Sequence, residues 1–196
     1  ACPLPDIWLV SDAVNDAADS TNLILDPEHA SYHAVSLLLK VFDLTEAMGR
    51  ARASGVVLVW RGAPADMERN RFNELLGQIE HFQESLEHEA AKLVDTEDNR
   101  LASALERPFQ DSRAAGHRFL DMARSQIGQA KRARIGASEY MSLATKEIDA
   151  QYRLFDMCAG ALESLLDARL RHYAFKRTVT GVFLLFVTAL AFVAYT

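Results

Sequence analysis

The chain is poor in the residues that cross-link a fold or interrupt a helix. Its 196 residues include two cysteines, five prolines and nine glycines. Cys2 and Cys158 are too few for a disulfide framework or a cysteine metal centre, and they pair only if the fold brings the N-terminus to the middle of the last helix. With 49% hydrophobic and 24% charged residues, the composition is that of a globular protein.

Clustered positive charge is also missing. The formal net charge is −6, and basic residues are scattered along the chain. The one tight cluster, at 131–134, is short and is typical of a solvated helix end or loop. Because a phosphate-binding face needs grouped lysine and arginine, we expect no nucleic-acid partner.

The sequence lacks a recognisable catalytic or metal-binding motif. It has no glycine-rich phosphate loop, and no serine or cysteine has an evident His–Asp pair. His29 and His33 lie four residues apart, as a metal-binding pair would, but no third ligand accompanies them at a recognisable spacing. His81 and His88 are also interpreted as solvated surface residues. We therefore expect no enzyme, no metal and no cofactor within these residues.

What the chain does contain is helical periodicity, without a convincing alternating strand pattern. Asp26-Pro27, the turn Arg61–Pro64, Pro108 and the stretch 128–136 separate the periodic segments. The fold class predicted is all-α, an up-and-down helical bundle. The expected helices are 6–25, 28–60, 65–105, 108–128 and 139–195, although 95–99 could also break or kink the third.

Each predicted helix has an apolar stripe that we expect to face the core. In the second helix the stripe is interrupted by Glu46, and in the third the opposite face is heavily charged. The second-helix stripe is Tyr32, Val35, Leu39, Phe42, Gly49, Ala53, Val56 and Trp60. The third-helix stripe is Phe72, Leu75, Leu76, Ile79, Phe82, Leu86 and Leu93, opposite Glu80, Glu84, Glu87, Glu89 and Lys92.

The last predicted helix runs into nineteen residues, 178–196, that carry no charge. A run of that length can cross a hydrocarbon core of about 30 Å, so lipid is its expected partner. Nothing between Arg169 and Lys176 interrupts the helix, which predicts one continuous rod. The sequence thus predicts a helical domain at 1–177 and a transmembrane helix at 178–196.

Two stretches resemble the sensor regions of proteobacterial methyl-accepting chemotaxis proteins and related membrane histidine kinases and diguanylate cyclases. The first runs from Asp19 to Pro27 (DSTNLILDP) and is followed by Ser31-Tyr32. The second begins at Glu147 (EIDA) and continues into the apolar run. The resemblance implies a helical periplasmic sensor in the bacterial inner membrane, with a cytoplasmic output domain after the span. It implies no particular ligand.

The flanking charges allow a second interpretation. Arg169, Arg171, Lys176 and Arg177 lie before the span, and positive charge normally marks the cytoplasmic side. Residues 1–10 lack the basic start and long apolar run of a signal peptide. We therefore expect either a sequence cut at both ends, with a periplasmic sensor, or a tail-anchored interaction or structural protein that faces the cytosol.

Two further expectations concern partners. Polar residues that point into the bundle, namely Asn22, Tyr32 and Arg52, are the candidate contacts for an unknown small-molecule or protein ligand.

The last helix carries a heptad-like seam through Ile148, Phe155, Leu162 and Leu165, with Gln151 as a polar member. That seam predicts a homodimer, unless it packs inside its own bundle.

Overall fold

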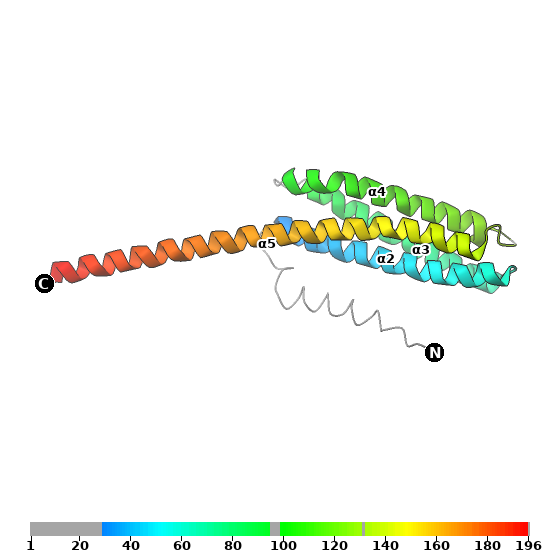
Figure 1. Cartoon of the computed structure of the whole chain (residues 1–196), viewed down its shortest axis with the longest axis horizontal. Helices are drawn as coiled ribbons and strands as arrows, with labels where there is room; N and C mark the ends of the chain where they lie inside the picture. The colour runs from blue at the N-terminus through cyan, green and yellow to red at the C-terminus, as the bar shows by residue number, and fades with distance from the viewer. Residues whose placement is uncertain (1–28, 95–98, 131, 196) are drawn as a thin grey trace, which may run out of the picture.

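The structure, a computed structural model, describes residues 29–94, 99–130 and 132–195 and is all-α over these ranges. Within these ranges, four long helices form an up-and-down bundle (Figure 1). They are α2 (His29–Arg61), α3 (Asp66–Val94), α4 (Asn99–Ala123) and α5 (Ala137–Tyr195), with a π-helical turn, η2 (Arg124–Gly128), after α4. The expected helix at 6–25 lies outside the described residues, as does Cys2.

The turn between α2 and α3 is confirmed where the sequence predicted it. Gly62 has a φ of +79°, the left-handed conformation that glycine adopts without steric penalty at the end of a helix. Its N–H donates to the carbonyl oxygens of Leu58 and Val59 at 3.2 and 3.1 Å. At the start of α3, the Glu68 carboxylate accepts a hydrogen bond from the Ala65 N–H at 3.0 Å. The two helices are thereby set side by side and antiparallel.

The boundary between the third and fourth helices was placed wrongly. We expected one helix to run from 65 to 105 and the next to begin at Pro108. In the structure α3 ends at Val94, and α4 begins at Asn99 and passes through Pro108. Proline removes one helical hydrogen bond, that to the carbonyl of Ala104. Because Ala104 is exposed, water can satisfy that carbonyl and the helix continues.

The face of α2 that enters the bundle overlaps the predicted stripe only in part. Val35 of the stripe is buried and Val56 packs against the core. Within that stripe Tyr32 is 40% exposed and Trp60 is 81% exposed, and a Cβ at Gly49 would meet nothing within 4 Å. Most of the buried residues lie on the neighbouring face and repeat at the same three-four spacing. They are Ala34, Leu37, Val41, Leu44, Met48, Ala51, Gly55 and Leu58. Both faces have a helical period, so periodicity could not decide between them.

Helices α2 and α5 lie close together at Gly55. A Cβ placed on Gly55 would lie 2.4 Å from the Tyr140 hydroxyl oxygen. Tyr140 is fully buried, and its hydroxyl donates to the Ala51 carbonyl oxygen at 3.1 Å. Burial raises the pKa of this phenol, so the hydroxyl remains a donor. A residue without a side chain is therefore required at position 55.

The charged face of α3 is also less solvated than we expected. Glu89 is only 6% exposed, and its Oε1 accepts a hydrogen bond from His33 Nδ1 at 2.9 Å. Its other carboxylate oxygen, Oε2, lies 3.2 Å from Lys92 Nζ. The side chain of His33 is 14% exposed, so its interpretation as a solvated surface histidine was wrong. His81 and His88 are exposed, as expected. Glu89 and His33 instead join α3 to the first turns of α2.

Glu89 should make stability depend on pH in the acid range. Burial acts to raise the pKa of its carboxyl, but hydrogen bonds from His33, Lys92 and Ser36 outweigh burial and hold that pKa below its ordinary value. A lowered folded-state pKa stabilises the protein above the unfolded-state pKa of about 4.3, and this contribution is lost as the pH falls through the folded value.

We expect Glu89→Gln to reduce the free energy of unfolding by about 1–2 kcal/mol at pH 7. The difference from the wild type should shrink as the pH falls below the ordinary glutamate pKa. Urea unfolding at pH 7, 5 and 3.5 measures it. The exposed Glu84→Gln is the matched control and should show little difference; an equal loss for both variants would contradict the role of Glu89.

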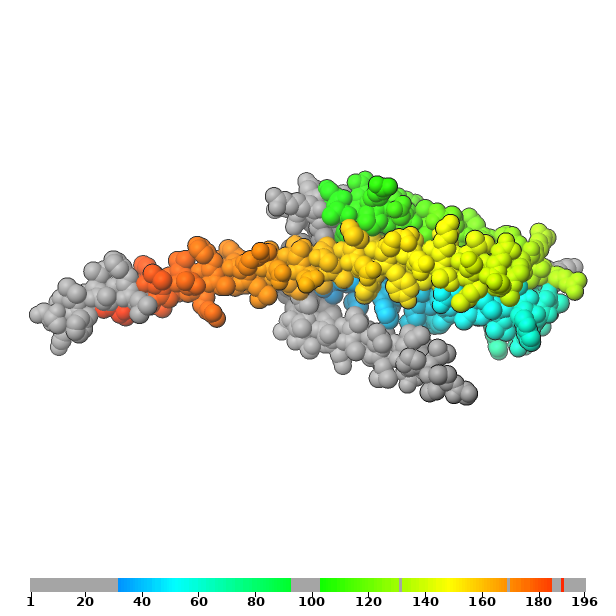
Figure 2. Space-filling model, viewed as in Figure 1, coloured from blue at the N-terminus to red at the C-terminus, as the bar shows by residue number. Residues whose placement is uncertain are grey.

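The last helix is unbroken across Arg169–Lys176, as predicted, and is 59 residues long. Its first half supplies core residues such as Ile148 and Leu154. Beyond the bundle it continues alone among the described residues (Figure 2), and residues 171–184 are exposed. Among the described residues, no helix meets the length and hydropathy expected of a membrane span. Of the predicted span at 178–196, the side chains of 185–187 and 189–196 lie outside the description.

The seam predicted for a homodimer packs inside its own bundle. Ile148 is 2% exposed, and Phe155, Leu162 and Leu165 pack against the same core. Gln151 is fully buried and is bonded to Ser112 of α4. The seam therefore explains how α5 joins the bundle, which was the alternative left open by the sequence.

Candidate functional site

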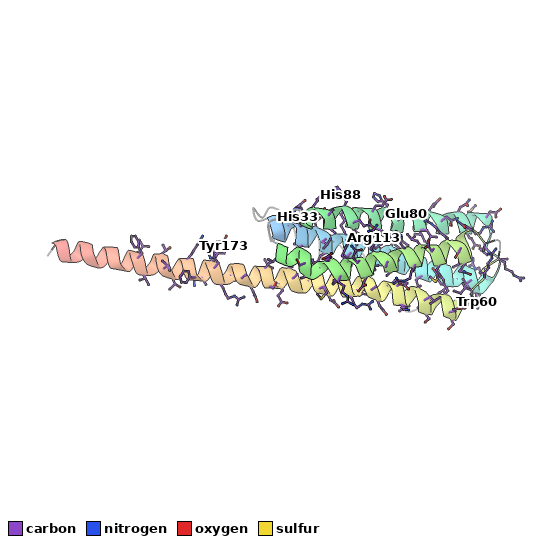
Figure 3. All side chains as sticks on the ribbon, turned by 90° about the horizontal axis from the view of Figure 1, so that it is seen from above. His33, Trp60, Glu80, His88, Arg113 and Tyr173 are labelled. Atoms are coloured by element: carbon purple, nitrogen blue, oxygen red, sulfur yellow. The ribbon has the colours of Figure 1, made fainter. Side chains whose placement is uncertain are left out.

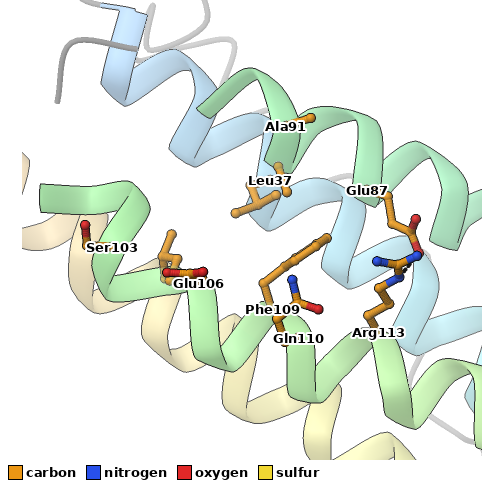
Figure 4. Close-up of a pocket in the computed structure, with 10 residues that line it drawn as sticks. Leu37, Glu87, Ala91, Ser103, Glu106, Phe109, Gln110 and Arg113 are labelled. Atoms are coloured by element: carbon orange, nitrogen blue, oxygen red, sulfur yellow. Dashed lines mark ion pairs between the residues drawn. The ribbon is translucent and has the colours of Figure 1, made fainter. Parts of the chain in front are cut away.

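A pocket of about 400 Å³ lies between α3 and α4, over α2 (Figure 4). Its lining residues belong to the half of the bundle from which α5 leaves (Figure 1). Leu37 of α2 and Leu105 of α4, both buried, reach its inner wall. The half-buried ring of Phe109 covers the middle of the pocket. This volume is in the range of pockets that hold small molecules.

Polar groups surround this apolar floor. Arg113 Nε lies 3.0 Å from Glu87 Oε1 and closes one end of the pocket (Figure 4). Glu106 and Gln110 of α4 and Ser103 line the rest of the rim. The three charged lining residues are two carboxylates and one guanidinium. The pocket can therefore accommodate an apolar body and a polar or positively charged group at once.

A buried polar layer lies next to the Arg113 end of the pocket. Gln83 Nε2 donates to the Arg113 carbonyl oxygen at 3.3 Å, and Gln83 Oε1 is buried without a hydrogen-bond partner. Gly116 makes room for this amide, because a Cβ there would lie 2.5 Å from Oε1. A buried acceptor without a donor is uncommon in proteins and is a place where a water or a ligand donor is stabilised.

The candidate ligand residues from the sequence do not form this pocket. Asn22 lies outside the described residues. Tyr32 lies on the outer face of α2, where its ring meets His33 edge-on at 5.3 Å. Arg52 is half-buried and donates to the Thr145 hydroxyl at 3.1 Å, which links α2 to α5. Twenty residues of helix separate Tyr32 from Arg52, about 30 Å, so one small ligand cannot contact both.

Sequence reasoning missed the pocket because its walls come from three helices. Glu87 was assigned to the charged outer face of the third helix, and no role was assigned to Phe109. Their neighbours across the pocket depend on the register of α3 against α4, which periodicity does not give. Pairs of opposite charges such as Glu87 and Arg113 indicate which helix faces meet, but they do not single out the pocket. Other pairs join α3 to the following segment in the same way, among them Glu80–Arg124 at 2.6 Å (Glu80 and Arg113 are labelled in Figure 3).

The described residues contain no grouping suited to a metal. No three histidine, cysteine or acidic side chains come together in the part of the chain that the structure describes. Cys158 is a buried free thiol, and burial raises its pKa to about 12. It therefore has little thiolate character near neutral pH.

Comparison with known proteins adds no assignment. No protein-family model matches the chain, and neither a curated protein nor a solved structure matches it.

Proposed function

We propose that the chain is the extracytoplasmic sensor domain of a bacterial transmembrane signalling receptor of the chemoreceptor kind. The observation that supports this proposal is the continuity of α5. The helix that contributes Tyr140, Ile148 and Leu154 to the bundle core runs on, without interruption, into the charge-free residues 178–196. A change in bundle packing is then carried directly to the apolar end of the helix.

The mechanism we infer is a small displacement of α5 that biases two output states. Fifty-nine helical residues extend about 89 Å. Such a rod transmits a shift or rotation, whereas a flexible linker absorbs it. A ligand changes the population of the two states by as much as its affinity for them differs.

Membrane lipid is the partner proposed for residues 178–196. These nineteen residues are rich in phenylalanine, leucine, valine and alanine and have no charged side chain. The length matches a hydrocarbon core of about 30 Å. In this proposal the bundle faces the periplasm, and an output domain follows the span in the complete gene product.

The pocket between α3 and α4 is the ligand site we favour. Leu37 and Phe109 suit an apolar group, and the Glu106–Gln110 side suits a hydrogen-bond donor or a cation. A thermal-shift comparison of aromatic amines with carboxylates of matched size tests this preference. Stabilisation by the amines should be lost in Phe109→Trp, which fills the pocket.

The alternative function is a tail-anchored interaction or structural protein that faces the cytosol. It is favoured by the basic flank of Arg171, Lys176 and Arg177, since positive charge usually remains inside. Labelling separates the two proposals. Ser138→Cys places a thiol at an exposed position of α5, and a membrane-impermeant maleimide applied to intact spheroplasts modifies it only if the bundle is extracytoplasmic.

Rigidity of α5 yields a second test. We expect seven glycines inserted after Arg171 to abolish the response of the complete receptor, while seven alanines leave most of it. Both insertions add about two helical turns and preserve the phase, but each glycine weakens the helix by about 1 kcal/mol relative to alanine. Circular dichroism should show the same bundle melting in both. An unchanged response with glycines would show that α5 is not the transmitter.

A homodimer is proposed as well, with its contact beyond the bundle. Leu170 is 67% exposed and Tyr173 is 64% exposed, and they continue the three-four spacing from Leu166. Figure 3 shows Tyr173 on the part of α5 that has left the other helices. Two parallel copies of α5 would cover these side chains.

A further inference from the structure

A second pocket, of about 360 Å³, lies between α4 and α5, which are neighbours in the bundle (Figure 1). It shares no lining residue with the pocket between α3 and α4, and the positions of α4 that line the two pockets are about half a helical turn apart. The two pockets are therefore separate and lie on different sides of α4. The side chains that line the second pocket are those of Pro108, Asp111, Ala150, Arg153, Asp156 and Met157.

Small side chains leave this space, and hydrogen bonds hold it open. Pro108 of α4 and Ala150 of α5 have compact side chains, and Ala150 is 4% exposed. Beside the pocket, the Gln151 amide donates to the Ser112 carbonyl oxygen at 2.9 Å and accepts a hydrogen bond from the Ser112 hydroxyl. Because Gln151 and Ser112 directly follow two lining residues in the sequence, these bonds fix the distance between the walls. The pocket is thus formed before any ligand enters it.

Three charged side chains of the pocket make no ion pair within the part of the chain that the structure describes. They are Asp111 of α4 and Arg153 and Asp156 of α5, and all three are exposed. Arg118 lies near enough to interact with Asp111, but its guanidinium is bonded to Glu147 at 2.7 and 3.0 Å. One guanidinium and two carboxylates therefore line the same small pocket without neutralising one another.

These charges indicate the class of ligand. A guanidinium binds a carboxylate through two parallel hydrogen bonds, and carboxylates accept hydrogen bonds from an ammonium group. A simple anion would meet the two aspartates and a simple cation would meet Arg153, so neither satisfies all three groups. A molecule that carries both charges close together does. The apolar part of the wall, formed by Pro108, Ala150 and Met157, suits a small hydrocarbon side chain.

We propose that the pocket between α4 and α5 binds a small primary aminocarboxylate with an apolar side chain. Its carboxylate pairs with Arg153, its ammonium group lies between Asp111 and Asp156, and its side chain covers Ala150 and Met157. The pocket volume is in the lower part of the range for small-molecule sites. This site is additional to the pocket between α3 and α4, and it does not depend on the proposed receptor function.

Isothermal titration calorimetry of the chain in detergent micelles tests the class of ligand. The probes are leucine, leucinamide, which lacks the carboxylate, and 4-methylpentanoate, which lacks the ammonium group. Leucine should bind with 1:1 stoichiometry. Each analogue loses charge-assisted hydrogen bonds and should bind at least about tenfold more weakly. A leucine titration without binding, or equal affinities for the three probes, would overturn the proposal.

Substitutions test the position of the ligand. Arg153→Gln and Asp111→Asn should each weaken leucine binding at least about tenfold, because each removes one charged partner. Lys146→Gln and Asp149→Asn make the same chemical changes at exposed positions of α5 outside the pocket and should leave the affinity unchanged. Thermal melting followed by circular dichroism shows that each variant is folded. Wild-type affinity in Arg153→Gln would contradict the proposal.

Two further variants separate a bound ligand from a packing defect and from the other pocket. Arg153→Glu should reverse the preference, so that leucinamide binds more tightly than leucine, whereas a distorted pocket would weaken both. Phe109→Trp fills the pocket between α3 and α4 and should leave leucine binding unchanged. Loss of leucine binding in Phe109→Trp would place the ligand in that other pocket and would overturn the assignment to α4 and α5.

Discussion

Gln151→Glu is expected to lower the free energy of unfolding by about 3–5 kcal/mol at pH 8, because it places a charge where the structure offers no compensation. Gln151 is fully buried. Its Nε2 donates to the Ser112 carbonyl oxygen at 2.9 Å, and its Oε1 accepts from the Ser112 hydroxyl. A carboxylate would oppose that carbonyl and would lie one helical turn from Glu147, which already pairs with Arg118 at 2.7 Å.

The loss should depend on pH with a defined sign. Burial and the nearby carbonyl raise the folded-state pKa of the new carboxyl above its unfolded value of about 4.3. The protonated acid can donate a hydrogen bond as the amide does, so the loss of unfolding free energy relative to the wild type is small below the unfolded-state pKa. It grows as the pH rises through the folded-state pKa.

Urea unfolding from pH 3.5 to 8 measures both the size and the sign. Gln78→Glu makes the same chemical change at an exposed position of α3 and should have little effect at any pH. A deficit for Gln151→Glu that is equal at pH 3.5 and 8 would point to a steric cause and would contradict the electrostatic explanation.

Gly55→Ala is expected to lower the free energy of unfolding by about 1–3 kcal/mol, although alanine is the better helix former. The added methyl group would lie 2.4 Å from the Tyr140 hydroxyl oxygen. Tyr140 cannot withdraw easily, because it is fully buried and bonded to the Ala51 carbonyl at 3.1 Å. Relief therefore requires α2 and α5 to separate or the tyrosine to lose its hydrogen bond.

Gly77→Ala is the matched control. Gly77 is exposed within α3, and a Cβ there meets nothing within 4 Å. The same substitution should raise the free energy of unfolding by about 0.5–1 kcal/mol, through helix propensity alone. If the two variants change stability in the same direction, the close contact of α2 with α5 is not as described. The double variant Gly55→Ala/Tyr140→Leu should recover part of the loss, because the contacting ring is gone.

The candidate site was less predictable than the helices because it depends on neighbours that are distant in sequence. Glu89 and Glu80 look alike on the charged face of α3. One is buried against His33 of α2, and the other meets Arg124 near the surface. The pocket likewise needs Leu37, Glu87 and Phe109 to be brought together from three helices. No local pattern records the rotation and register that do this.

The sequence by itself determined the all-α class, the turn at Gly62, the limits of α2 and the unbroken course of α5. Each depends on local properties: periodicity, the conformational freedom of glycine, and the absence of a helix-breaking residue between Arg169 and Lys176. The tertiary structure alone decided which of the two apolar faces of α2 enters the bundle. Gly49 and Gly55 lie on the two different faces, and Tyr140 of α5 lies against Gly55 while a Cβ at Gly49 would meet nothing within 4 Å. Burial is a property of the packed neighbours, so a helix with two apolar faces does not specify its core side until its partners are in place.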